Sequence, residues 1–171
     1  LSWLGSWGGL CKGGALNPRL LVLTDIGQDP DDQQSLVRLL VYANEFDIEG
    51  LIATADNNYK HEPPTIHTDY LKEGVRRYGE VLGRLRQHNS NFPLVAELQS
   101  VIKAGNDRGG GNVPVFETIG LGRDSEGSEW IIDRVDAEDE RPLCVAVWGG
   151  TCDLAQALWK VRAYRSEEDV S

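Results

Sequence analysis

The chain has 171 residues, of which 40% are hydrophobic and 26% are charged, an ordinary balance for one globular domain. Its formal net charge of −10 predicts no nucleic-acid partner, because binding a polyanion needs a basic surface that releases counterions. No apolar run reaches the roughly 18 residues of a membrane span, so no membrane partner is predicted. The acidic composition is more compatible with a small neutral or cationic ligand. The sequence does not decide the oligomeric state, and a homo-oligomer is possible.

Residues 1–18 are predicted to be an irregular lead-in, and residues 19–171 are predicted to form the domain itself. The lead-in is rich in glycine and tryptophan and lacks the charged-then-apolar pattern of a signal peptide. The chain contains no methionine, which we interpret as the mark of a processed product or of part of a longer protein. Its three cysteines have no metal-type spacing and predict neither a disulfide framework nor a zinc site.

The first third of the chain alternates between strand and helix patterns. Residues 20–24 are a continuous aliphatic run, typical of a strand that is buried on both faces. From residue 31 to about residue 44, apolar side chains recur every three or four positions, which predicts a helix with acids in its first turn. Residues 48–54 are predicted to form the second strand of a right-handed strand-helix-strand unit.

The rest of the chain continues the alternation. A third buried strand is predicted at residues 143–148, and residues 104–122, with three consecutive glycines, are predicted to be a connection or a flap over a crevice. Amphipathic spacing predicts four further helices, at residues 66–85, 95–103, 125–137 and 153–164. The fold class is therefore α/β, with three layers, a mostly parallel sheet and helices on both faces. Three predicted strands are fewer than most sheets contain.

Four carboxylates follow the first strand, at Asp25, Asp29, Asp31 and Asp32. Acids this close repel one another, so they need hydrogen bonds, a helix N-terminus or a cation to stay ionised. Any one of them alone could be a turn residue or a helix cap. Together they favour a hard-cation site such as Ca²⁺, which takes about six to eight oxygen ligands. An EF-hand is excluded, because the loop lacks its glycine and its final glutamate.

Residues 55–64 form a polar loop after the second strand and contain Asn57, Asn58 and His61. Open parallel sheets bind ligands beyond the carboxyl ends of their strands, so this loop and the acidic loop are predicted to border one crevice. The two asparagines are either turn residues or, with amides that both donate and accept, ligands for sugar hydroxyls. His61 is either a surface residue or an acid or base at the crevice.

Several blocks of sequence, in order, resemble one family. Residues 24–32 are similar to the Asp-x-Asp-Pro-Gly-x-Asp-Asp motif of nucleoside hydrolases, with two additional residues. Longer blocks at residues 29–40, 45–54, 125–129 and 147–158 resemble the nucleoside hydrolase-like domain of the cellulose-binding Sde182 family. The similarity runs from about Arg19 to Arg165, and several blocks in the same order are more specific than any single motif.

This resemblance implies roles for the acids. Asp25 and Asp32 are expected to bind Ca²⁺, and Asp25 is also expected to take a proton from the water that attacks the anomeric carbon. Asp31 is expected to contact the sugar. Asp29, one of the two additional residues, is expected to replace or supplement a metal ligand.

The same resemblance places Asn57, with Asn58 beside it, at the sugar hydroxyls, and gives the metal a main-chain carbonyl near Cys152. It implies a hydrolase of N-glycosidic bonds, acting on a nucleoside or a related glycoside. The alternative is a carbohydrate-binding protein, in particular a cellulose-binding one, that keeps the fold without catalysis. In the family, a further metal aspartate and the leaving-group acid lie in a C-terminal half, so we expect this chain to be the N-terminal portion of the domain.

Overall fold

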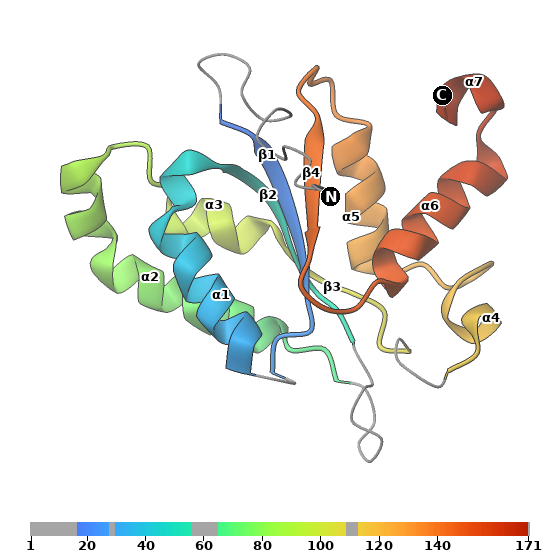
Figure 1. The fold of residues 1–171 in the computed structure, drawn as a ribbon, viewed down its shortest axis with the longest axis horizontal. Helices are drawn as coiled ribbons and strands as arrows, with labels where there is room; N and C mark the ends of the chain where they lie inside the picture. Colours follow the sequence, from blue (N-terminus) through green and yellow to red (C-terminus); the bar gives the residue numbers. More distant parts are fainter. Residues whose placement is uncertain (1–16, 28–29, 56–64, 109–112, 171) are drawn as a thin grey trace, which may run out of the picture.

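The computed structural model describes residues 17–27, 30–55, 65–108 and 113–170 (Figure 1). Its centre is a parallel sheet of four strands in the order β3-β2-β1-β4. The strands are β1 (Arg19–Thr24), β2 (Asp47–Ala53), β3 (Ile102–Ala104) and β4 (Leu143–Val147). The α/β class and the parallel sheet predicted from the sequence are confirmed.

Helices cover both faces of the sheet (Figure 1). On one face lie α1 (Pro30–Val41), α2 (Thr68–His88) and α3 (Val95–Ser100), and on the other lie α5 (Glu126–Val135) and α6 (Cys152–Tyr164). Short helical turns complete the described part of the chain, at η1 (Ala43–Glu45), α4 (Val115–Thr118) and α7 (Glu167–Val170). None of the helices in the described ranges is long and apolar enough to cross a membrane.

The sheet separates two hydrophobic cores, because successive side chains of a strand point to opposite faces. Val22 of β1 belongs to the core beneath α1, α2 and α3, whereas Leu21 and Leu23 belong to the core beneath α5 and α6. All three side chains are fully buried. The continuous aliphatic run of β1 is therefore explained by a central strand with helices on both sides.

One predicted helix is shorter in the structure than the sequence indicated. The prediction extended it over residues 95–103, but α3 ends at Ser100 and residues 102–104 form β3. The strand pairs with the end of β2, with Ile102 opposite Leu51 and Ala104 opposite Ala53. The spacing of apolar residues reports only local structure and does not reveal pairing with a distant strand. For this reason the sequence predicts that the helix continues through β3.

The amino ends of the strands are held together by Arg19, the first residue of β1, which is 2% exposed. Its guanidinium donates to both carboxylate oxygens of Glu49 at 2.6 and 2.9 Å. It also donates to the main-chain carbonyls of Arg134, at the end of α5, and of Arg141, just before β4. Arg19 thus links β1 with β2, with the end of α5 and with the segment before β4. Asp25 and Asp32 follow β1 and lie at its opposite, carboxyl end.

Candidate functional site

Three neighbouring strands end side by side at the carboxyl edge of the sheet. Thr24 of β1 lies opposite Ala53 of β2, and Leu23 lies opposite Val147 of β4. The residues that follow these strands are therefore brought together, including Asp25, Thr54 and Gly149. The N–H of Thr54 donates to the carbonyl of Thr24 at 2.8 Å, so the chains that leave β1 and β2 start side by side. Most of the loop at residues 55–64 lies outside the described residues, so the crevice between the two loops stays a prediction.

Asp32 lies in the first turn of α1 and is buried. Its Oδ2 accepts a hydrogen bond of 2.5 Å from the hydroxyl of Thr24, which in turn accepts one from the main-chain N–H of Ile26. The neighbouring Asp31 is exposed, and its Oδ1 accepts from the N–H of Asp32. The carboxylate of Asp32 is thereby fixed at the end of β1, while Asp31 faces solvent and is accessible to a ligand.

Asp25 is half-buried and packs directly against Gly149, the second residue after β4. A methyl group at position 149 would overlap the Asp25 carboxylate. The hydroxyl of Thr54 donates to the carbonyl of Gly149 at 2.7 Å, and a methyl at Gly150, where φ is +71°, would clash with this hydroxyl. Because Gly149 has no side chain, the carboxylate of Asp25 can pack against the main chain at this position.

The acidic loop also contacts the start of α2 through Gly27, where φ is +103°. A Cβ there would lie 2.6 Å from the ring of His67 and 2.8 Å from that of Tyr70. These two rings stack on each other, with centroids 4.7 Å apart and an interplanar angle of 9°. His67 and Tyr70 at the start of α2 therefore pack against Gly27 of the acidic loop.

The described residues include two of the acids that the sequence predicts to bind Ca²⁺, and the N-terminus of α6. Asp25 and Asp32 are oxygen donors of the kind that Ca²⁺ prefers, and Cys152 begins α6 close to the glycines after β4. Within the described ranges, no three acidic, histidine or cysteine side chains converge. Asp29, Asn57, Asn58 and His61 lie outside the described residues, so their predicted roles remain predictions. The donor chemistry fits Ca²⁺, and a complete coordination shell requires further ligands.

Asp153 is a residue of this region that the sequence prediction missed. It lies in the first turn of α6 and is 0% exposed. Its Oδ1 accepts from the hydroxyl of Ser125, the N-cap of α5, and at 2.9 Å from the N–H of Asn106, two residues after β3. Its Oδ2 has no hydrogen-bond partner in the described structure. One buried carboxylate thus ties together the segments that follow β3 and β4.

Replacing Asp153 by asparagine is expected to remove one contribution to folding stability that falls as pH rises. Burial raises the pKa of Asp153 above its ordinary value, so the folded protein binds this proton more tightly than the unfolded chain. Its contribution to stability is therefore present below the unfolded pKa of about 3.9 and is lost as pH rises through the folded pKa. Urea unfolding at a series of pH values should show the stability of the wild type falling relative to that of Asp153→Asn as pH rises. Identical pH profiles would contradict the prediction.

Comparison with known proteins identifies the family of this chain. The family model described as the nucleoside hydrolase-like domain of cellulose-binding Sde182 matches residues 19–171. The chain belongs to this family. A comparison with curated proteins gave no match.

A solved structure supports the membership in the Sde182 family. It is described as a nucleoside hydrolase-related hypothetical protein from Saccharophagus degradans that is associated with carbohydrate metabolism. It is 38% identical to this chain, with a TM-score of 0.78, and the match covers 90% of this chain and 36% of that one. The chain therefore has the fold of a nucleoside hydrolase-like domain and spans about a third of the length of the matched protein.

Proposed function

We propose that this Sde182-family domain, within a protein that carries the complete site, hydrolyses an N-glycosidic bond of a nucleoside or a related glycoside with the help of Ca²⁺. The observation that carries the proposal is the pair of carboxylates that flank the end of β1. Asp25 packs against Gly149, and Asp32 is held by Thr24. Both are positioned at the sheet edge where parallel α/β folds bind their ligands.

In this proposal the acids serve as metal ligands, as the proton acceptor and as a contact to the sugar. Asp25 and Asp32 hold the cation, with Asp29 and the main-chain carbonyl of Cys152 as further ligands. When bound, Ca²⁺ acts as a Lewis acid that makes a water molecule more acidic. Asp25 takes the proton from the attacking water, and the exposed Asp31 contacts the sugar, beside Asn57 and Asn58. The proton acceptor is held in place because the carboxylate of Asp25 is packed against the main chain at Gly149.

Ca²⁺ is expected to raise the melting temperature of the 171-residue chain, and Asp25→Ala is expected to abolish that increase. A ligand that binds only the folded state stabilises it by about 2.7 kcal/mol at a hundred times its Kd. Melting curves with Ca²⁺ and with EDTA measure the difference. Asp133→Ala, an exposed acid on α5, removes the same charge and should keep the response. If Ca²⁺ does not change the melting temperature of the wild-type chain, the acids of this chain do not bind Ca²⁺ by themselves.

Catalysis is tested on a protein that contains the complete domain, because the chain covers only 36% of the matched structure. A panel of nucleosides and related glycosides is incubated with that protein, and free base and free sugar are measured. Release by the wild type and its loss in Asp25→Ala would support hydrolysis. Bound Ca²⁺ without release from any N-glycoside would refute it.

A second function is favoured by the family description, which names cellulose binding. In that case the domain keeps the fold and binds a carbohydrate without cleaving it. Sedimentation of the protein with microcrystalline cellulose separates the two proposals. Retention on cellulose without turnover supports binding alone, whereas turnover without retention supports the hydrolase.

A further inference from the structure

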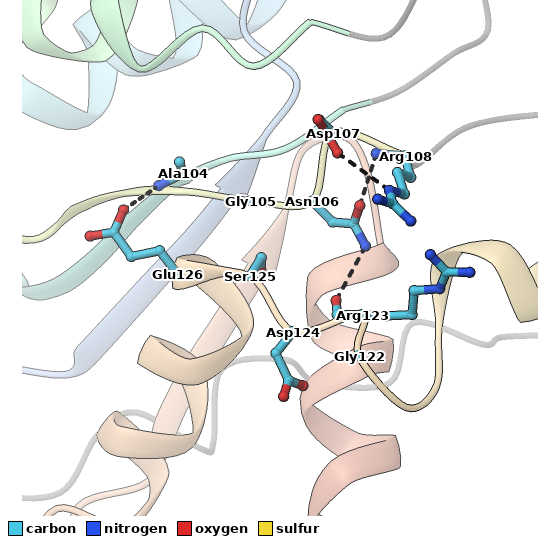
Figure 2. Close-up of a pocket in the computed structure, with 10 residues that line it drawn as sticks. All are labelled: Ala104, Gly105, Asn106, Asp107, Arg108, Gly122, Arg123, Asp124, Ser125 and Glu126. Carbon is cyan, nitrogen blue, oxygen red and sulfur yellow. Dashed lines mark hydrogen bonds and ion pairs between the residues drawn. The ribbon is translucent and has the colours of Figure 1, made fainter.

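A cavity lies at the carboxyl end of β3. It has a volume of about 240 Å³ and is formed where residues 104–108 face residues 122–126 (Figure 2). Asn106 joins the two segments, because its side-chain amide donates to the carbonyls of Thr118 at 3.0 Å and Arg123 at 3.4 Å. The volume is below the roughly 300–1,000 Å³ of pockets for drug-sized ligands, so the cavity suits a small group.

Two of the acids that line this cavity are already neutralised by lysines that are not among its lining residues. Asp124 accepts from the side-chain amide of Gln156 at 2.7 Å and pairs with Lys160 at 2.9 Å, and these contacts lower its pKa. Glu126 pairs with Lys103 at 3.3 Å and also accepts from the N–H of Ala104. Figure 2 shows the carboxylates of both acids directed away from the two arginines of the cavity.

Those arginines, Arg108 and Arg123, are poorly compensated. Arg123 is half-buried, and no described residue accepts a hydrogen bond from its guanidinium or forms an ion pair with it. Arg108 is exposed, and among the described residues its one ion-pair partner is the exposed Asp107, whose Oδ1 lies 3.9 Å from its Nε. Figure 2 shows both guanidinium groups on the same side of the cavity. Two cations therefore share one cavity, and neither has a close acidic partner among the described residues.

We propose that Arg108 and Arg123 bind the anionic group of a small ligand, a carboxylate or a phosphate. The planar guanidinium presents paired N–H donors that match the two oxygens of either group. A bound anion would also relieve the repulsion between the two like charges. The amino end of α5 opens on the same cavity and adds a favourable potential for negative charge. Neither residue belongs to the proposed Ca²⁺ site, so this inference does not depend on the proposed hydrolysis.

Equilibrium dialysis of the 171-residue chain with labelled inorganic phosphate or labelled glucuronate, at fixed ionic strength and in buffer freed of metal ions by a chelating resin, tests the proposal. The metal-free buffer removes any contribution from a bound cation and contains no competing carboxylate. We expect saturable binding of at least one probe. Arg123→Gln should weaken the affinity by about tenfold, because the anion then loses one charged hydrogen-bond donor. Arg108→Gln is a second variant with the same expected direction. Arg84→Gln, on the exposed surface of α2, is the matched control for the change in charge.

The outcomes separate the ligand classes. Binding of phosphate alone that Arg123→Gln weakens supports a phosphate site, and binding of glucuronate alone supports a site for a sugar carboxylate. No saturable binding of either probe would overturn the proposal. Equal weakening by Arg84→Gln would also overturn it, because the effect would then come from net charge rather than from the cavity.

Discussion

Replacing Arg19 by methionine is expected to lower the free energy of unfolding by about 3–5 kcal/mol, the usual cost of removing one partner of a buried ion pair. The substitution leaves the carboxylate of Glu49, 18% exposed, without the two hydrogen bonds that it now accepts. The carbonyls of Arg134 and Arg141 lose a donor as well. Urea-induced unfolding, followed by circular dichroism, measures the change.

A double variant distinguishes the loss of the pair from the loss of packing. Arg19→Met combined with Glu49→Leu removes both charges and leaves no uncompensated carboxylate. We expect the double variant to be more stable than Arg19→Met alone, because buried ion pairs are often replaced by apolar residues at little cost. Additive effects of the two single substitutions would show that the two charges do not interact.

Replacing Gly149 by alanine is expected to destabilise the chain by about 1–3 kcal/mol, the range for overpacking a filled space, and to weaken the response to Ca²⁺. The backbone at position 149 does not have a positive φ, so alanine meets no conformational barrier there. Its methyl group would instead displace the carboxylate of Asp25. Unfolding curves with and without Ca²⁺ measure both effects in one experiment.

Gly83→Ala is the control for that substitution. Gly83 lies within α2, and an added methyl group would meet no heavy atom within 4 Å. Alanine is favoured over glycine in a helix by about 1 kcal/mol, so this variant should be slightly more stable than the wild type and should keep its Ca²⁺ response. If both alanine variants behaved alike, the close packing of Asp25 against Gly149 would not matter.

The sequence predicted the elements whose patterns are complete within a short stretch. The aliphatic run before Asp25 predicted β1, because a central strand needs apolar side chains on both faces. The helical spacing that begins at Asp31 predicted α1, which carries its two acids in the first turn. Both patterns are local, and the packing of the folded protein requires the same secondary structure that they predict.

The features that the sequence did not predict depend on distant partners. Residues 102–104 became a strand because they pair with β2, more than 45 positions earlier in the chain. Asp153 is buried because Ser125 and Asn106 supply its hydrogen bonds. An acid in the first turn of a helix is usually an exposed cap, so its sequence position gave no reason to expect burial.

The outer edge of β4 has a consequence for how the sheet can be extended. The N–H of Trp148 donates to Leu23 of β1, so by alternation the N–H groups of Val145 and Val147 point away from β1, where the sheet has no further described strand. The side chains of these two valines are 36% and 40% exposed. The opposite edge, β3, is only three residues long and is in contact with α5 and α2. A strand from another polypeptide segment could therefore extend the sheet by hydrogen bonding to β4. If the protein self-associates at high concentration, we expect pairing at the β4 edge to cause it.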